Sequence, residues 1–204
     1  MSGGLLQLSG VVIDLVHRID HLPASGEEVE ARGFSIEAGG GFNAMVAARR
    51  MGASVTYGGV LGTGLLAEVA LRALVAEGLP VAASTRAAKD QGSCAVLVDA
   101  NGERSFVSHH GAERNVTMAH LELLNASAYD FALLTGYSLY KPESAAAFVP
   151  WLSARPVPPQ LFFDPGPIVA DIPAAALDPV MARSRWVSAN AGEASVLTGE
   201  ADPA

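Results

Sequence analysis

Apolar and polar positions along the chain form two kinds of strand pattern. Continuous apolar runs such as "FALLTG" and "QLFFDPG" are typical of strands buried on both faces, as in parallel sheets. The N-terminal run "LLQLSGVVIDLV" has the same character, and it predicts one buried strand that ends at Asp14. Stretches at roughly 29–38, 92–99 and 104–109 instead alternate between apolar and polar residues, which predicts strands with one exposed face.

Helical signals fall between the apolar runs. Glycine, proline and capping residues bound predicted helices over residues 44–51, with Asn43 as N-cap, and over 65–77 and 142–153. Further helices are predicted from Thr117 to Asn125, over "IPAAALDPVMAR" and from Glu193. Because strands and helices alternate in the second half, we expect a parallel sheet with helices on both faces. The Asn-Gly pair in "SCAVLVDANGERSFVSH" predicts a hairpin, so the alternating strands form a small β appendage.

Composition narrows the class of protein. Half of the 204 residues are hydrophobic and 17% are charged, which is enough apolar material for a buried core. The formal net charge of -8 argues against a nucleic-acid partner, because phosphate backbones are bound by basic faces. The longest apolar runs are shorter than the ~20 residues of a membrane helix, so no membrane partner is expected. Cys94 is the single cysteine, which predicts a protein of the reducing cytoplasm.

The stretch "GGGFNAMVAARRMG" at residues 39–52 places three glycines directly before a helix. Glycine allows a ligand to come close to the backbone, and the N–H groups of a helix start point outward. A tight strand-to-helix turn explains the same residues, and the glycines alone do not decide between the two. Their contiguous spacing does not match the G-x-G-x-x-G pattern of dinucleotide-binding proteins.

Taken together, the motifs resemble those of the ribokinase/PfkB family of carbohydrate kinases, in the same order. "GVVID" and "LPASGEEV" come first, and "GGGFNAMVAARRMGA" matches the first signature of the family. "GGVLGTG", "LVAEGL", "NGERSF" and "FFDPG" follow, and "NAGEASVLTG" at residues 190–199 matches an N-x-x-E motif. The resemblance implies a ribokinase-like α/β fold, with a mostly parallel central sheet flanked by helices and a small antiparallel β lid. Residues 1–204 would then be one domain, incomplete at the C-terminus, with lid strands from about 15–38 and 92–110.

The resemblance also assigns acceptor-binding roles. Asp14 matches an aspartate that hydrogen-bonds sugar hydroxyls, and such charge-assisted bonds are strong; its alternative role is to cap a loop. Gly40 and Gly41 match a pair whose backbone approaches the sugar, although Gly39 could replace Gly41 in this signature. Asn43 matches an asparagine that bonds a hydroxyl, and its alternative role is the plain helix N-cap.

A metal and a phosphoryl donor are implied in the same way. Asn190 and Glu193 match the residues that organise Mg²⁺ in the family, through water, and magnesium keeps several waters when it binds proteins. The alternative is a helix start with Asn190 as cap and Glu193 at the third helical position. The implied donor is ATP, the acceptor is a small sugar or nucleoside, and the lid is the expected contact of a homodimer.

Two departures from the family pattern bear on activity. The chain has "GTGLLA" where the family usually carries an aspartate in G-x-D-x-x-G. The second signature, D-T-x-G-A-G-D, supplies the anion hole and the catalytic aspartate, and it has no match in the 204 residues. No catalytic residue is therefore assigned. The complete protein is expected to be an ATP-dependent carbohydrate kinase, and this chain alone is expected to be inactive.

Other interpretations stay open. The chain could be a non-catalytic sugar-binding or regulatory module derived from a kinase, and a dinucleotide-dependent oxidoreductase is a more distant alternative. Fructose, ribose, a keto-deoxy sugar acid and a nucleoside are all possible acceptors, and no strong basic cluster in the sequence marks a sugar phosphate. Asp164 lies either at the cleft or in an Asp-Pro turn. His17 and His21 are interpreted as solvated loop residues and not as metal ligands.

Overall fold

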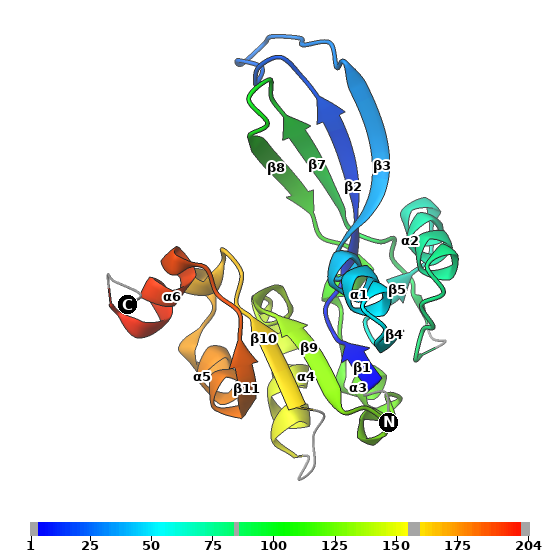
Figure 1. The fold of residues 1–204 in the computed structure, drawn as a ribbon, viewed down its shortest axis with the longest axis vertical. Coiled ribbons are helices and arrows are strands. Elements are labelled where there is room, and N and C mark those ends of the chain that lie inside the picture. Colours follow the sequence, from blue (N-terminus) through cyan, green and yellow to red (C-terminus); the bar gives the residue numbers. More distant parts are fainter. Residues whose placement is uncertain (1–3, 84–85, 155–159, 201–204) are drawn as a thin grey trace.

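The computed structural model describes residues 4–83, 86–154 and 160–200. A helix-flanked body carries a four-stranded sheet that projects from it (Figure 1). The body contains a five-stranded central sheet in which every neighbouring pair is parallel. In spatial order its strands are β11 (Ser184–Val187), β10 (Gln160–Asp164), β9 (Phe131–Thr135), β1 (Gly4–Gln7) and β4 (Ser54–Tyr57).

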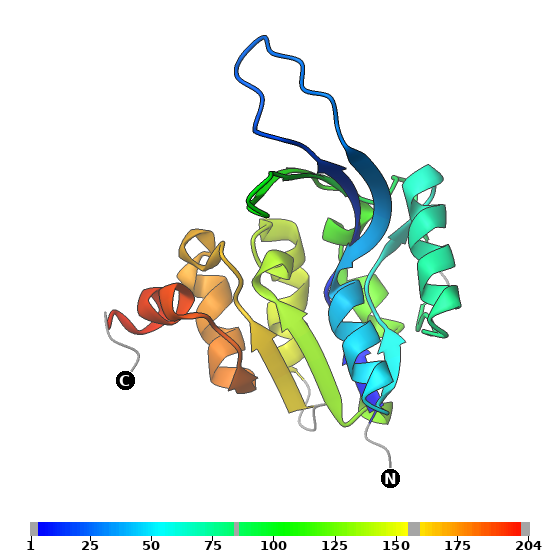
Figure 2. The ribbon, with the colours of Figure 1, turned by 45° about the horizontal axis from the view of Figure 1, so that its top comes forward.

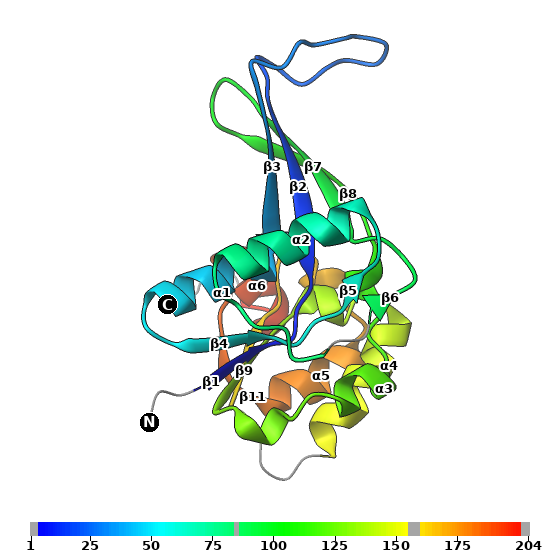
Figure 3. The ribbon, with the colours of Figure 1, turned by 90° about the vertical axis from the view of Figure 1, so that its right-hand side faces the viewer.

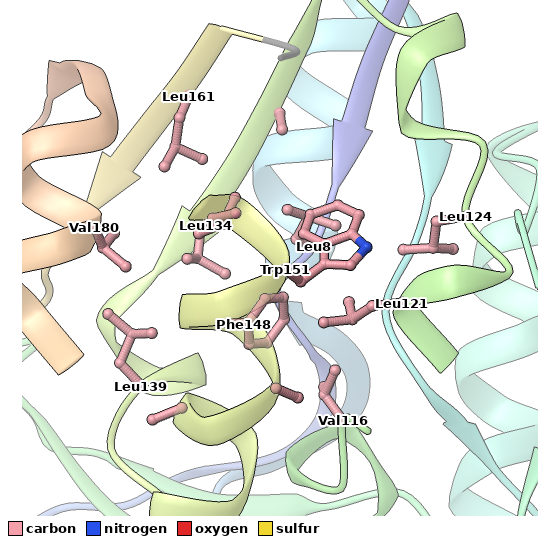
Figure 4. Packing of buried hydrophobic residues seen from close by; sticks show 14 of the residues in the cluster. Leu8, Val116, Leu121, Leu124, Leu134, Leu139, Phe148, Trp151, Leu161 and Val180 are labelled. Atoms are coloured by element: carbon pink, nitrogen blue, oxygen red, sulfur yellow. The ribbon is translucent and has the colours of Figure 1, made fainter. Parts of the chain in front are cut away.

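Helices cover both faces of the central sheet (Figure 2). One face packs against α3 (Met118–Glu122), α4 (Pro142–Ser153) and α5 (Ala174–Arg183). Phe148 and Trp151 of α4 belong to one apolar cluster with Leu134 of β9 and Leu161 of β10, and Trp151 lies beside Leu8 (Figure 4). The other face carries α1 (Gly41–Arg50) and α2 (Leu65–Ala76), which contribute Met45 and Leu74 to a second apolar cluster.

The remaining elements are short. A two-stranded parallel sheet joins β5 (Leu61–Gly62) to β6 (Arg86–Ala87), and α6 (Ala191–Thr198) follows β11. Four 3₁₀ turns are η1 (Ala112–Arg114), η2 (Ala126–Ala128), η3 (Gly136–Ser138) and η4 (Val169–Asp171). Across the described ranges, no helix is both long enough and apolar enough to cross a bilayer.

The projecting sheet is called the lid sheet below. It consists of β3 (Gly33–Gly40), β2 (Val11–Arg18), β7 (Ser93–Val98) and β8 (Arg104–His109), in that spatial order. The outer pairs are antiparallel hairpins, but the central pair of β2 and β7 is parallel. Viewed from the side, α2 lies across the base of this sheet (Figure 3).

The structure confirms the predicted fold class and corrects the predicted first strand. Instead of one strand ending at Asp14, the chain breaks between Gln7 and Val11 and passes from the central sheet into the lid sheet. Asp14 is therefore the fourth residue of lid strand β2. The strand predicted at roughly 29–38 is β3, which begins later, at Gly33, and ends at Gly40.

Most helix boundaries follow the predicted signals, with one correction that concerns the site. Thr117 accepts a hydrogen bond from the backbone N–H of His120 and caps α3, although that helix ends at Glu122 and not at Asn125. Pro142 opens α4 as predicted. The helix after the glycines begins at Gly41 with Gly40 as N-cap, so Asn43 is not the N-cap.

Buried polar side chains hold the two sheets together where the chain crosses between them. The Gln91 amide donates to the carbonyl of Val11 at 2.7 Å and accepts from the N–H of Gly62 at 3.0 Å. The Glu113 carboxylate is 4% exposed, and it accepts from the N–H of Gly92 at 2.7 Å and of Gly111 at 3.0 Å. These two glycines flank the β7–β8 hairpin, so one carboxylate fixes both ends of half of the lid sheet.

We predict that Glu113→Ala destabilises the protein strongly. The substitution leaves two buried backbone N–H groups without an acceptor, so the free energy of unfolding should fall by about 2–4 kcal/mol. Urea unfolding followed by circular dichroism measures the change. The control is Glu122→Ala at an exposed position of α3, where a change within about 0.5 kcal/mol is expected. Equal effects of the two substitutions would contradict the role given to Glu113.

Candidate functional site

A cleft of about 490 Å³ lies between the lid sheet and the carboxyl ends of the central strands. This edge is where ligands bind in open parallel α/β sheets. We call it the acceptor cleft. Residues of both sheets line it, including Val12, Asp14 and Ser108 of the lid sheet and Thr135 and Asp164 of the central sheet.

Asp14 faces the acceptor cleft from the middle of β2 and is half-buried. Burial raises the pKa of its carboxyl group, and the nearby Glu37 carboxylate raises the pKa further, while Arg104 acts against them. The folded protein therefore disfavours the ionised form of Asp14. A bound ligand with hydroxyl groups would supply the hydrogen-bond donors that this carboxylate needs.

The three glycines before α1 are required for separate reasons. A Cβ atom on Gly39 would collide with the carboxylate of Asp14, so Gly39 makes room for that side chain. Gly40 has a φ of +62°, and its backbone passes close to the carbonyl of Gly10. Gly41 packs against the carbonyl of Ser9 and the amide of Gln7. Gly40 and Gly41 line the acceptor cleft, so their backbone is within reach of a ligand.

Asn43 lies at the third position of α1 and is exposed. Its alternative role as N-cap is excluded, because Gly40 occupies that position. Among the described residues its side chain has no hydrogen-bond partner, and Asn43 is not one of the residues that line the cleft as it stands. Its hydroxyl-binding role stays a prediction.

Asn190 and Glu193 form a complete capping box at the start of α6. The side chain of Asn190 accepts from the N–H of Glu193 at 2.9 Å, and the Glu193 carboxylate accepts from the backbone N–H of Asn190 at 3.0 Å. The cap uses only part of the hydrogen-bonding capacity of the carboxylate. Glu193 is partly exposed, so its oxygens can accept bonds from further donors such as metal-bound water. Within the part of the chain that the structure describes, no group of three or more His, Cys, Asp or Glu side chains could hold a metal directly.

Asp164 lies both at the cleft and in an Asp-Pro turn, the two positions that its sequence allowed. It ends β10 and lines the acceptor cleft, and its carboxylate also accepts from the N–H of Gly166 at 3.0 Å, as in an Asp-Pro turn. Burial and the neighbouring Glu193 raise its pKa. His21 is exposed beside Glu27, as expected for a solvated loop, whereas His17 lies within β2 against the ring of Phe34.

Sequence reasoning missed a second group of residues along the same cleft. Glu113, Arg114 and Tyr137 line it, from η1 and η3. The Arg114 guanidinium donates to the carbonyl of Tyr137 and lies 5.0 Å from the centre of the Tyr137 ring. No local motif marks these residues, because they come together only when the end of the β7–β8 hairpin packs beside the end of β9.

The fold and the cleft define an α/β protein with a cleft, lined in part by polar residues, beneath a projecting β sheet. The model of the pfkB family of carbohydrate kinases matches residues 7–204, and the chain belongs to this family. It is 32% identical over 194 residues to an uncharacterised sugar kinase of Escherichia coli (strain K12), YegV. That match covers 94% of this chain and 59% of the relative, so the chain spans about three fifths of the relative's length.

Solved structures show the same fold. Ribokinase from Giardia lamblia superimposes with a TM-score of 0.79 at 17% identity, over 100% of this chain and 62% of that one. Ribokinase from Arabidopsis thaliana, solved as a complex with ribose and ATP, gives a TM-score of 0.71 at 21% identity, over 98% and 64% of the two chains. The resemblance seen in the motifs is thereby confirmed.

We predict that Asp14→Asn weakens binding of the acceptor without destabilising the fold. Because the pKa of Asp14 is raised in the folded protein, its ionised form lowers stability at neutral pH. The variant should therefore unfold at pH 7 with a free energy no lower than that of the wild type. Any advantage should shrink as the pH falls toward the ordinary pKa of 3.8 and vanish below it, where the wild-type carboxyl is protonated in both states.

The affinity for the acceptor should fall roughly 10- to 100-fold, because a charge-assisted hydrogen bond is lost. Thermal unfolding across pH 4–8 and calorimetric titration with the sugar measure the two effects. A marked loss of stability at pH 7 with unchanged sugar affinity would show that Asp14 serves only to cap its loop.

Proposed function

We propose that the complete protein is an ATP-dependent sugar or nucleoside kinase, and that this chain carries its acceptor-binding part. The observation that carries the proposal is the placement of Asp14 and the backbone of Gly40 and Gly41 along one cleft. A half-buried carboxyl group with a raised pKa, in a cleft that the backbone of two glycines also lines, suits vicinal hydroxyls. Membership of the carbohydrate kinase family supports the same assignment.

In the proposed reaction, a hydroxyl oxygen of the acceptor forms a bond to the γ-phosphorus of ATP. The bond from that phosphorus to the β,γ-bridging oxygen breaks, and ADP leaves. Asp14 accepts hydrogen bonds from the acceptor hydroxyls and orients them, since transfer of this kind depends mainly on positioning. Closure of the lid sheet would exclude water, which otherwise competes as acceptor.

The proton of the attacking hydroxyl passes to a base. In our proposal the base is the aspartate of the second family signature, which the 204 residues do not contain. None of the described cleft carboxylates is assigned to that step. Turnover is therefore not expected from this chain alone.

Asn190 and Glu193 fit a magnesium site only through water. The capping box already occupies part of each side chain, and the partly exposed Glu193 carboxylate keeps lone pairs that can accept from metal-bound water. Magnesium would neutralise negative charge on the ATP phosphates. We further propose that the protein acts in the reducing cytoplasm, in agreement with the buried free thiol of Cys94.

The experiment that tests the proposed function uses the complete protein. Incubated with ATP, Mg²⁺ and a panel of sugars, sugar acids and nucleosides, it should release ADP with at least one acceptor, and mass spectrometry should detect that acceptor 80 Da heavier. The 204-residue chain alone should show no turnover under the same conditions. Binding of a sugar by the complete protein without any phosphoryl transfer would instead favour the non-catalytic module.

We propose in addition that the lid sheet forms a homodimer contact. Ile36, Leu15, Ala95 and Val107 form one cross-strand row through all four lid strands. Side chains alternate along a strand, so this row lies on the face opposite Asp14. Ile36 is 51% exposed and Val107 68% exposed. An exposed apolar row of this kind suits burial against a second copy of the sheet.

We predict that Ile36→Glu converts a dimer into a monomer, because it buries a charge within the apolar contact. Light scattering after size-exclusion chromatography of the complete protein measures the mass. The matched control is Val75→Glu, since Val75 is 69% exposed on α2, and this variant should stay dimeric. A wild-type monomer at tens of micromolar, or a dimeric Ile36→Glu variant, would refute the contact.

A further inference from the structure

A second pocket adjoins the acceptor cleft and is strongly basic. It has a volume of about 580 Å³ and is lined by Lys89, Ser108, His109, His110, Arg114, Asn115, Lys141 and Glu143. We call it the basic pocket. Lys89 and Lys141 are the only two lysines in the sequence, and the chain as a whole has a net charge of -8. Three permanent cations thus gather around one pocket that contains a single carboxylate, Glu143.

These cations come from distant parts of the chain, so the cluster is invisible in the sequence. Lys89 precedes β7, Arg114 ends η1, and Lys141 stands immediately before α4. The sequence shows no strong basic cluster, but the fold brings these three cations together along one pocket. The pocket also lies at the N-terminus of the 12-residue helix α4, whose dipole adds positive potential there.

Neutral groups hold the three cations in place. The Lys89 ammonium donates to the carbonyl of His110 at 3.0 Å. Arg114 donates to the carbonyl of Tyr137, and the Lys141 ammonium lies 5.8 Å from the centre of the Tyr140 ring. The ion pairs found among residues 4–83, 86–154 and 160–200 include none of the three. Their charge is held in position without an ion pair, although Glu113 favours the charged form of Arg114 and Glu143 lines the same pocket.

His110 provides an independent indication of a positive field. Burial is the largest cause of the lowered pKa of its imidazole, and Arg114, Lys141 and His109 each lower that pKa further. Glu113 is the one neighbour that acts in the opposite direction. An anion placed in this pocket would relieve repulsion among the cations and would accept hydrogen bonds from them.

The basic pocket belongs to the acceptor side of the site. It shares Ser108, His109, His110 and Arg114 with the acceptor cleft. By contrast, Asn190 and Glu193, which we assign to the metal and thus to the ATP side, do not line it. A ligand whose hydroxyls contact Asp14 can therefore extend past the end of β8 into the basic pocket.

We propose that the acceptor is an anionic sugar, whose phosphate or carboxylate group occupies the basic pocket between Lys89, Arg114 and Lys141. This inference rests on the proposed kinase function, because it names the substrate class of the same site. Arginine binds phosphate and carboxylate through paired hydrogen bonds, and the lysines add point charges. Either group satisfies the pocket, and the two are distinguished by experiment.

The test compares matched neutral and charged ligands on the complete protein by calorimetric titration. The pairs are fructose with fructose 6-phosphate and glucose with gluconate, and inorganic phosphate probes the pocket directly. At least one charged sugar should bind about 10-fold or more tightly than its neutral partner. The pair that shows the larger preference identifies phosphate or carboxylate as the preferred group.

Lys89→Gln and Lys141→Gln should each weaken binding of the charged ligand about 10-fold, with neutral sugar unchanged within about 2-fold. Arg72→Gln removes a cation from an exposed position of α2 and should have no effect. The inference is overturned if neither charged sugars nor phosphate bind preferentially. It is also overturned if the lysine substitutions weaken ATP instead, because the anion would then belong to the nucleotide.

Turnover with the same ligands tests the proposed function separately. Charge-selective binding that depends on both lysines, without phosphoryl transfer to any ligand, would sustain the anion pocket and refute the kinase. Transfer to a neutral sugar, with no effect of the lysine substitutions, would sustain the kinase and refute the anion pocket.

Discussion

The architecture depends on how the backbone N–H and C=O groups find hydrogen-bond partners where the chain passes from the central sheet into the lid sheet. Between β1 and β2 the backbone leaves the hydrogen-bonding ladder of the central sheet, in a region closed to water. Unpaired N–H and C=O groups in such a place are costly. Buried side chains supply the missing partners. The Gln7 amide donates to the carbonyl of Gly41, and the Tyr57 hydroxyl donates to the carbonyl of Val60 and accepts from the N–H of Val11. Gln91 and Glu113 make the corresponding bonds at the base of the β7–β8 hairpin. These bonds act together with apolar packing, because Val11 and Ile13 of β2 share an apolar cluster with α1 and α2.

The proposed acceptor site lies on this junction. The glycines bring the start of α1 against the β1–β2 crossing, and the absence of a Cβ on Gly39 leaves the space that Asp14 occupies. The resulting environment raises the pKa of Asp14 and of Asp164. Carboxylates kept in a disfavoured charge state lower stability, and a ligand that bonds to them recovers that free energy. The carboxyl groups that favour ligand binding at this site therefore lower the stability of the unliganded protein.

Sequence patterns predicted those features of the fold that depend only on residues close together in the chain. Pro142 and Thr117 mark helix starts, and Asn190 with Glu193 forms its capping box, because each depends on neighbours within four residues. The sequence could not show that the first apolar run would divide between two sheets, since both halves are equally apolar. It also could not show that Asp90 caps α2 from a distant segment, or that Lys89, Arg114 and Lys141 would meet. Such features depend on tertiary contacts. The family resemblance singled out Asp14, Gly40 and Gly41 without knowledge of those contacts, and the structure places all three along the cleft, while their binding role stays a prediction.

The parallel pairing at the centre of the lid sheet has a consequence for the order of folding. Each hairpin is local in sequence, but Ile13 of β2 pairs with Ser93 of β7. The intervening residues form α1, β4 and α2, so the loop that must close is long and costs entropy before the pairing is gained. The two hairpins can form early, each with an open edge, while their union waits for the helices between them. We therefore expect the acceptor cleft to be completed late in folding, because its lining comes from both hairpins, and a chain with an unjoined lid sheet would lack an intact cleft.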